Sequence, residues 1–531
     1  MSQMLRSSSY IRCLLGSSKQ QAVLFGVKRW STAAAAQRAI PQEWDNAKPY
    51  EDMPGPKPLP ILGNAWRFIP KIGNLSGFGF IELGQYLQKH YGDIAKLSGI
   101  PGRTDMVMVF DPDDIEKVFR NEGPWPIRET VECFVYYRSV TRKDIFQGVG
   151  GLVTVQGEEW QKFRSKVNQI MMQPRATKLY IGPIDSVADD FVERIRALRD
   201  EKLEMPSDFN NEMYKWGLES IAYIALDTRL GCFNPDLKPD SEPQKMIDAV
   251  QIMFDAMYKM EIQVPFWKIM STPAWRALVN SADYFVDVSL KYIKQAMERL
   301  KNLPPDSDRE LTVLEKLLAK DPDIRTTVVM ALDMLGAGID TTSYTAVVVM
   351  YMLSKNQDKQ EKLFQEVQRV LPNKKEPITA EKLNEMKYLR ACIKETMRIS
   401  PITGGNQRNL SKDLVLGNYR VPKGTSIMMP GLLLSRMDKH FPQANKFIPE
   451  RWLKDEPESK MKLHSFVTLP FGFGPRTCIG RRFAELEIET LLAKVVRNFR
   501  IEYNYGDMKF VSKLLYTPSS PLKFKMIDRE N

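Results

Sequence analysis

Helical periodicity fills most of the chain after residue 80 and restricts it to a fold built largely from helices. Apolar residues recur every three or four positions in ten segments, a spacing that predicts α-helices. The segments are residues 80–91, 113–120, 158–172, 184–199, 206–226, 243–260, 274–300, 324–354, 357–370 and 380–400. Shorter stretches of alternating polarity predict strands at residues 94–97, 106–109, 414–416, 419–421 and 426–429. We therefore expect a mainly α protein with minor β-sheets.

One proline-rich segment precedes the helices. Residues 54–60 hold four prolines in seven positions, which excludes a helix or a central strand there. No second segment of this kind, no repeat and no low-complexity block interrupts the rest of the chain. We predict an N-terminal lead at residues 31–53, followed by one domain at residues 54–531.

The first forty residues differ in composition from the rest. They contain six lysines and arginines and many serines, and the first carboxylate of the chain is Glu43. A basic, serine-rich and acid-poor start is typical of a mitochondrial transit peptide. We predict such a peptide at residues 1–30, with an approximate end, and the alternative is a disordered basic tail.

Composition excludes several kinds of protein. The net charge is +11, but the basic residues form no tract and show no zinc-finger spacing, so no nucleic-acid partner is predicted. The five cysteines are widely spaced, which disfavours a disulfide framework, and the three histidines show no zinc-ligand spacing. No apolar run reaches the roughly 18 residues that a membrane-spanning helix needs.

A glycine-rich segment near the C-terminus carries the most informative cysteine. Residues 471–480 read FGFGPRTCIG and precede a predicted helix at 481–499. Glycines allow a sharp turn and a close approach to a flat ligand, and Arg476 can pair with a carboxylate. Because Cys478 lies just before a helix, we expect its thiol pKa to be lowered, which favours the thiolate. A buried structural cysteine is the alternative.

This run resembles the cysteine-loop pattern FxxGxRxCxG of the cytochrome P450 family and fits it at every fixed position. The resemblance implies a single-domain cytochrome P450 fold and heme b, iron protoporphyrin IX, as cofactor. It also implies that Cys478 is the axial thiolate ligand of the haem iron and that Arg476 helps to bind the cofactor. A thiolate ligand promotes cleavage of the O–O bond of dioxygen, so the resemblance predicts an oxygen-activating enzyme.

Three further motifs occur in the order that the family shows. Glu395 and Arg398 are three apart on one helix and can pair. In the family such a pair is buried and completed by a later arginine, which here corresponds to Arg451. The resemblance gives this trio a structural role, namely to hold the cysteine loop. In isolation, the Glu395–Arg398 pattern is usually only a solvated ion pair.

The second motif is the run Ala337-Gly-Ile-Asp340-Thr341, inside the helix predicted at residues 324–354. Glycine and consecutive threonines are poor helix formers, and a threonine hydroxyl can bond back to the carbonyl four residues earlier. The run resembles the AGxDT motif of the family. The resemblance implies that Thr341 holds water beside the cofactor and that Asp340 relays protons inward, whereas the alternative is a mildly strained core helix.

The third motif places Trp160 and Arg164 four residues apart on one helical face. In the family both bind a haem propionate, and Arg408 corresponds to another propionate-binding position. Propionates are anions in a mostly apolar pocket, so arginine partners are required. Taken alone, the Trp160–Arg164 pair would be read as a surface cation–π contact.

The electron donor is predicted to be a separate protein, because the chain shows no flavin or dinucleotide fingerprint. For a mitochondrial member the family implies an adrenodoxin-like 2Fe–2S ferredoxin and its NADPH-dependent reductase. Arg390 and Lys394 match the basic pair with which mitochondrial members dock this ferredoxin, and Arg481-Arg482 resembles a run typical of that clan. An ordinary solvated helix face is the alternative for these charges.

The overall pattern is most like the insect mitochondrial members of the family. This resemblance predicts a monooxygenase on the matrix side of mitochondria, acting on a lipophilic substrate: a xenobiotic such as an insecticide, which we favour, or an ecdysteroid-like sterol. Residues 264–270 combine aromatic, aliphatic and lysine side chains, which suits peripheral contact with the inner membrane. A loop tucked against the core explains them nearly as well.

Two other functions remain open at this point. A haem-thiolate isomerase or dehydratase would not use dioxygen, and the Asp340–Thr341 pair argues against it because such an enzyme needs no proton relay. A haem carrier or electron-transfer protein would need no groove for dioxygen beside the iron. The small residues of the run at 337–342 argue against that function.

Overall fold

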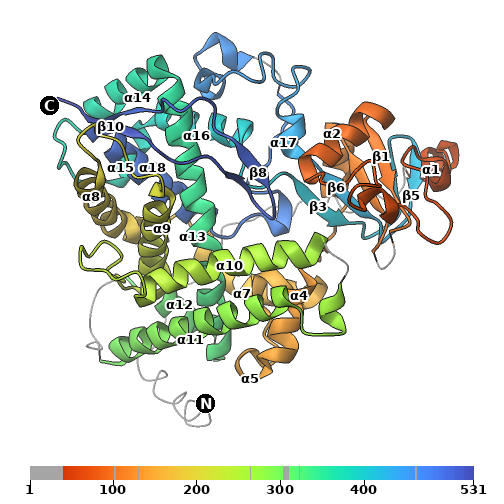
Figure 1. Cartoon of the computed structure of the whole chain (residues 1–531), viewed down its shortest axis with the longest axis horizontal. Coiled ribbons are helices and arrows are strands. Elements are labelled where there is room, and N and C mark those ends of the chain that lie inside the picture. Colours follow the sequence, from red (N-terminus) through yellow and green to blue (C-terminus); the bar gives the residue numbers. More distant parts are fainter. Residues whose placement is uncertain are drawn as a thin grey trace, which may run out of the picture.

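The long helices predicted from periodicity form the larger part of the molecule (Figure 1). The computed structural model describes residues 40–100, 103–129, 131–262, 265–302, 310–321, 323–460 and 463–530, so the predicted transit peptide lies outside the described residues. The predicted helices are confirmed to within about three residues at each end, with one exception. They are α2 (Phe80–Tyr91), α3 (Pro112–Arg120), α7 (Gly157–Met171), α8 (Ile181–Leu198), α9 (Phe209–Leu226), α10 (Glu242–Ile262), α11 (Pro273–Lys301), α13 (Ile324–Lys355), α14 (Gln357–Val370) and α18 (Arg481–Asn498).

The exception is the helix predicted at residues 380–400, which is two helices, α15 (Ala380–Glu385) and α16 (Lys387–Ile399). The backbone leaves helical geometry at Met386, where ψ is 68°. Directly after it, the amides of Tyr388 and Leu389 donate to the carboxylate of Glu366 at 2.8 and 2.9 Å. Because Glu366 belongs to α14, a contact distant in sequence caps the start of α16 and breaks the predicted helix.

All five predicted strands are present, and the largest sheet joins two distant parts of the chain. Its order is β1-β2-β6-β3, with antiparallel pairs at both edges and a parallel pair between β2 and β6. The bounds are β1 (Ile94–Leu97), β2 (Met106–Val109), β3 (Asn406–Asn409) and β6 (Ser426–Met429). The smaller pairs are β4 (Leu414–Leu416) with β5 (Tyr419–Val421), β7 (Phe499–Glu502) with β10 (Lys525–Asp528), and β8 (Phe510–Ser512) with β9 (Tyr516–Pro518).

Several short elements escape the sequence pattern. Besides β3 and β7–β10, these include α12 (Val313–Lys320), which begins with a capping box between Thr312 and Glu315. Eight residues are too few for a clear apolar periodicity. The other short helices are α1 (Ile40–Asn46), α4 (Glu132–Tyr136), α5 (Lys143–Phe146), α6 (Gly151–Thr154) and α17 (Gly431–Leu434).

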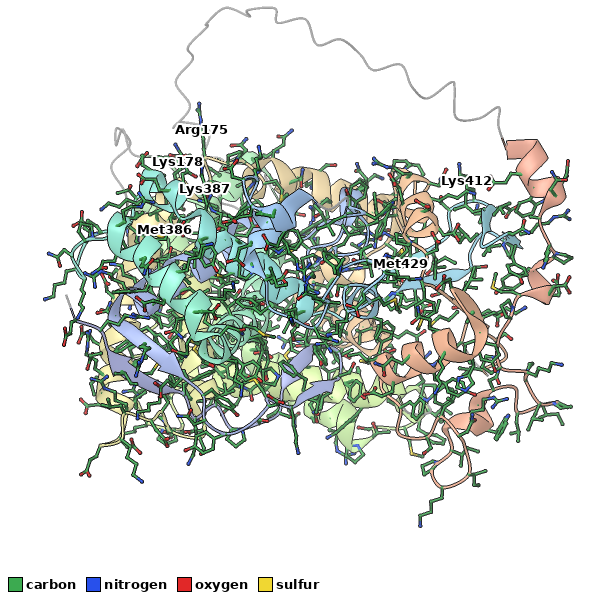
Figure 2. The ribbon with its side chains drawn as sticks, turned by 90° about the horizontal axis from the view of Figure 1, so that it is seen from above. Arg175, Lys178, Met386, Lys387, Lys412 and Met429 are labelled. Atoms are coloured by element: carbon green, nitrogen blue, oxygen red, sulfur yellow. The ribbon has the colours of Figure 1, made fainter. Side chains whose placement is uncertain are left out.

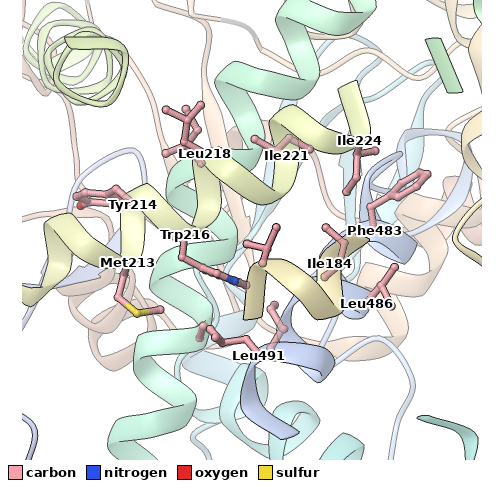
Figure 3. Packing of buried hydrophobic residues seen from close by; sticks show 14 of the residues in the cluster. Ile184, Met213, Tyr214, Trp216, Leu218, Ile221, Ile224, Phe483, Leu486 and Leu491 are labelled. Atoms are coloured by element: carbon pink, nitrogen blue, oxygen red, sulfur yellow. The ribbon is translucent and has the colours of Figure 1, made fainter. Parts of the chain in front are cut away.

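The buried apolar residues form two clusters. The larger one joins the long helices around α13, and Figure 3 shows part of it, with Ile184 of α8, Trp216 of α9 and Leu491 of α18. The smaller one lies under the four-stranded sheet, α2 and α3. The helix α13 packs closely on α9 and α18, and most of its residues are buried. This central helix and the start of α18 carry the main sequence motifs.

Candidate active site

The backbone conformation of the loop before α18 determines the position of Cys478. Gly472 and Gly474 both adopt a φ of 72°, in the left-handed region that favours glycine. A Cβ at Gly474 would lie 2.0 Å from the carboxylate oxygen Oε1 of Glu122, so no larger residue fits there. The amide of Cys478 donates to the carbonyl of Phe471 at 2.8 Å and closes the loop. Its side chain is exposed, although the neighbouring Arg476 is buried.

The thiol pKa of Cys478 differs from the expectation drawn from its position. Burial of the sulfur deep in the protein raises the pKa above its ordinary value, although part of the side-chain surface remains accessible to solvent. The amides of Gly480 and Arg481 and the charges of Arg164 and Arg128 lower it, but they do not outweigh burial. The expected net lowering is therefore wrong for the chain alone, and a metal bound to the sulfur would supply the missing stabilisation of the thiolate.

Four arginines gather around this loop. Arg128, Arg164, Arg408 and Arg476 influence one another electrostatically, and Glu122 is the carboxylate that lies among them. Burial, followed by repulsion from the other arginines, lowers the pKa of Arg476 to about 9. Burial and the charge of Arg128 lower the pKa of Arg164 to about 10. An excess of buried positive charge at one place is a binding site for anions.

The hydrogen bonds show where an anion can bind. Arg408 is already engaged, because its Nε donates to Glu122, its Nη1 to the carbonyl of Gln407 and its Nη2 to the carbonyl of Phe473. Arg476 uses two nitrogens, with Nε 3.0 Å from the carbonyl of Pro126 and Nη2 2.6 Å from the side chain of Gln156. Its Nη1 is buried and has no hydrogen-bond partner among the described residues. This unpaired donor fits a carboxylate, and heme b carries two.

Trp160 and Arg164 are both buried, so the reading of the two as a surface pair is wrong. The guanidinium of Arg476 lies 3.8 Å from the centre of the Trp160 ring, whereas that of Arg164 is 5.9 Å away. Arg164 donates instead to the carbonyl of Thr477, at 2.9 Å, directly before Cys478. Trp160 thus orients Arg476, and Arg164 supports the cysteine loop.

Two members of this cluster were not identified from the sequence. Arg128 follows an irregular segment, and Glu122 lies at the end of α3, far from the cysteine loop in sequence. The available signal for Arg128 was a lone arginine at the edge of an apolar and aromatic segment. Glu122 offered no such signal, because its importance arises only from its contact with Arg408.

Glu395, Arg398 and Arg451 meet in the protein interior. The carboxylate of Glu395 accepts from Arg398 at 2.8 and 2.9 Å and from Arg451 at 3.3 Å. It also accepts from the indole of Trp452 at 2.9 Å, and Glu395 and Arg398 have no exposed surface. The guanidinium groups of Arg398 and Arg451 also donate to backbone carbonyls at residues 435, 442, 443 and 446, and Nη2 of Arg398 is shared between Glu395 and residue 446. The trio ties α16 to the segment that leads toward the cysteine loop.

The run at 337–342 sits at the middle of α13, with Thr341 and Asp340 on different sides. The hydroxyl of Thr341 donates to the carbonyl of Ala337 at 2.7 Å, and Ala337 is exposed although most of α13 is buried. Asp340 is buried, its Oδ1 has no hydrogen-bond partner in the part of the chain that the structure describes, and burial raises its pKa to about 7. Since successive helical residues point about 100° apart, Asp340 can take up a proton behind the face that carries Thr341.

The two predicted docking residues lie on α16 but differ in their surroundings. Arg390 is half-buried, and its Nε lies 3.2 Å from the carboxylate of Glu489 on α18. Lys394 is exposed, and no ion pair joins it to a carboxylate of the described residues. Arg481 pairs with Glu485, and Arg482 donates to the carbonyl of Met172. Lys394 is thus better placed than Arg390 to meet a partner.

Comparisons with known proteins agree with this arrangement. Residues 53–526 match the family model described as Cytochrome P450. The chain is 41% identical to a protein of Drosophila melanogaster named "Probable cytochrome P450 301a1, mitochondrial", over 91% of this chain and 88% of that protein. It is 41% identical to "Cytochrome P450 CYP12A2" of Musca domestica, over 93% and 94% of the two chains. The chain belongs to the cytochrome P450 family of haem-thiolate monooxygenases, whose cofactor is heme b.

Proposed function

We propose that the protein is a mitochondrial monooxygenase that inserts one oxygen atom of O2 into a lipophilic substrate, with NADPH electrons delivered through ferredoxin reductase and a 2Fe–2S ferredoxin. The overall change is R–H plus O2, two electrons and two protons to R–OH plus water. The bound haem supplies the chemistry of oxygen activation. The observation that carries the proposal is the buried Asp340 beside Thr341, because the two protons must cross the protein to reach the site.

The decisive experiment is reconstitution of the haem-loaded protein with ferredoxin, its reductase and a panel of foreign compounds and sterols. We expect NADPH consumption that matches the formation of hydroxylated product. Conversion of a substrate without NADPH would instead support the isomerase or dehydratase alternative. A sharp preference of the enzyme for one sterol would exclude the xenobiotic as the substrate class. That result would leave the monooxygenase proposal intact.

The mitochondrial location is supported by the basic start of the chain and by relatives whose names include "mitochondrial". Residues 1–30 are proposed as the transit peptide. A fusion of these residues to a fluorescent protein should be imported into mitochondria, whereas the chain without them should not.

Ferredoxin docking is proposed at the basic surface that includes α16. Four basic side chains are exposed there, and none of them forms an ion pair with a carboxylate of the described residues: Lys394, Lys387, Arg175 and Lys178. Figure 2 shows Arg175, Lys178 and Lys387 close together at one side of the molecule, with Lys412 far from them. A surface of this kind attracts an acidic partner and makes association depend on salt.

We expect Lys394→Glu to weaken ferredoxin binding about tenfold, because it replaces an attraction with a repulsion at the contact. The measurement is the ferredoxin concentration needed for half-maximal reduction, at several salt concentrations. Lys412→Glu is the matched control, since it makes the same charge change on the distant turn before β4. Equal effects of the two substitutions would show that only net charge matters.

Peripheral membrane contact is proposed at residues 265–270, between α10 and α11; the neighbouring Val264 lies outside the described residues. Phe266, Ile269 and Met270 expose 56%, 84% and 63% of their surface, which is unusual for side chains so apolar. Lys268 lies beside them, partly exposed, and pairs with Glu132, so it would have to exchange this surface ion pair for an anionic headgroup. No described helix combines the length and apolarity that crossing a bilayer requires.

Ile269→Asp should reduce binding to vesicles that contain anionic lipid by about tenfold, because a charged group replaces an aliphatic one at the lipid boundary. Flotation of the protein with vesicles measures the bound fraction. Leu311→Asp, at another exposed aliphatic residue before α12, is the matched control and should leave binding unchanged. Undiminished flotation of the Ile269 variant would refute this contact.

A further inference from the structure

The side of Asp340 that faces away from Thr341 opens toward a groove. Asp340 and Tyr344 are four residues apart on one face of α13, and both line a solvent-connected groove of about 890 Å³. The other walls come from α10, α11 and the β8–β9 hairpin, including Thr517. Asp340 itself is only 4% exposed, so it lies at the floor of this groove.

Tyr344, which lines the groove together with Asp340, belongs to a pair of hydrogen-bonded tyrosines. Tyr214 of α9 donates its hydroxyl hydrogen to the hydroxyl oxygen of Tyr344, and the two rings stand perpendicular at 5.4 Å between centroids. Because Tyr344 accepts from Tyr214, its own hydrogen is directed elsewhere. Burial and the charge of Asp340 raise the pKa of Tyr214 and of Tyr344, so both hydroxyls stay protonated near neutral pH.

On this side, no basic side chain of the described residues forms an ion pair with Asp340. Burial is the only cause that raises its pKa, and no described lysine or arginine forms an ion pair with it. The lysines at the rim of the groove, Lys259 and Lys513, are both paired with Asp255, at 2.7 and 2.8 Å. The groups next to Asp340 are therefore neutral hydroxyls that can exchange protons with water, and no charged partner holds its carboxylate.

We infer that Tyr344 is the proton-transfer residue that connects Asp340 to water in this groove, with Tyr214 as the residue that positions its hydroxyl. In each transfer Tyr344 gives its proton to the Asp340 carboxylate and takes one from a groove water, and a proton from the bulk solvent restores that water, so the tyrosine is restored and Asp340 becomes neutral. Asp340 then releases that proton on the Thr341 side. Two such transfers supply the two protons that accompany the two ferredoxin electrons; the inference rests on the proposed monooxygenase function.

The first test uses Tyr344→Phe in the haem-loaded enzyme, reconstituted with ferredoxin and reductase. We expect the product formed per NADPH to fall about fivefold, hydrogen peroxide to rise correspondingly, and the solvent deuterium isotope effect on product formation to increase, while substrate affinity stays unchanged. Tyr214→Phe should produce smaller changes in the same direction. Tyr351→Phe is the matched control on the same helix, because its hydroxyl accepts from the amide of Met508 and lies outside the groove lining.

A second measurement needs no turnover and separates this inference from the proposed function. Infrared spectroscopy can follow hydrogen–deuterium exchange at the Asp340 carboxyl band, with Asp340→Asn used to assign the band. Exchange should be several-fold slower in Tyr344→Phe than in the wild type. Unchanged exchange and unchanged coupling in that variant would overturn the role of Tyr344. Absence of NADPH-dependent product in the wild type, with exchange still slowed in the variant, would reject only the monooxygenase function.

Discussion

Replacing Cys478 with serine is expected to abolish the reduced carbon monoxide spectrum that marks thiolate ligation and to lower monooxygenase activity by at least about 10³-fold. A serine hydroxyl is too weakly acidic to ligate as an anion under conditions in which a thiol can, and it donates less electron density to the iron. The loop geometry should survive, because the amide of residue 478 still reaches the carbonyl of Phe471. The measurements are the absorption spectrum of the reduced carbon monoxide complex and product formation.

The matched control is Cys133→Ala. Cys133 is buried in α4, and burial raises the pKa of its thiol to about 12, so it remains a protonated apolar side chain. We expect this variant to keep the thiolate spectrum. An unchanged carbon monoxide spectrum in Cys478→Ser would refute thiolate ligation by Cys478 and with it the placement of the active site.

Prediction from the sequence succeeds where the structure is determined locally. The helices α2 and α14 and the strands β1, β2, β4, β5 and β6 have the predicted bounds, since apolar spacing and turn residues lie within each segment. The break at Met386 could not be predicted in this way. It depends on Glu366, 22 residues before Tyr388, whose carboxylate caps α16 only once α14 and α16 pack together.

The same distinction between local sequence and distant contacts applies to the residues of the candidate site. Cys478, Arg476, Asp340 and Thr341 lie in contiguous motifs, so the sequence alone points to them. The cluster of arginines is different, because chain segments around residues 128, 164, 408 and 476 converge only in the folded protein. The sign of the Cys478 pKa shift was wrong for the same reason. Helix position is readable from sequence, but the depth of burial that outweighs it is not.

The hydrogen-bonded pair of Tyr214 and Tyr344 depends on a tertiary contact that the sequence does not reveal. Tyr344 follows the recognisable run by two residues, yet its role depends on Tyr214 of α9, 130 residues earlier. The close packing of α9 on α13 requires a glycine at one position. A Cβ at Gly338 would lie 2.6 Å from the side chain of Ile221, so α9 can approach α13 only because that residue is glycine. Gly338 therefore allows the close packing of α9 on α13 that accompanies the contact between Tyr214 and Tyr344.

Glu395→Gln is expected to destabilise the fold more than any other single substitution considered for this chain. It leaves the buried guanidinium groups of Arg398 and Arg451 without their counter-ion, and removing one partner of a buried pair typically costs about 3–5 kcal/mol. Urea denaturation of the haem-loaded protein measures the free energy of unfolding, and the absorption spectrum measures haem retention. Both should fall, because the trio anchors the segment that leads toward the cysteine loop.

Glu158→Gln provides the matched control for this loss. Glu158 forms an ion pair with Lys162 at 3.0 Å on α7, but both side chains are more than half exposed, and such pairs contribute about 0–1 kcal/mol. If the two variants lost equal stability, burial would not be the source of the effect at Glu395. A Glu395 variant that unfolds at a lower urea concentration but keeps its full haem content would separate the role of the trio in stability from its role in holding the cysteine loop. The trio would then stabilise α16 and its neighbours without holding the cysteine loop in its binding geometry.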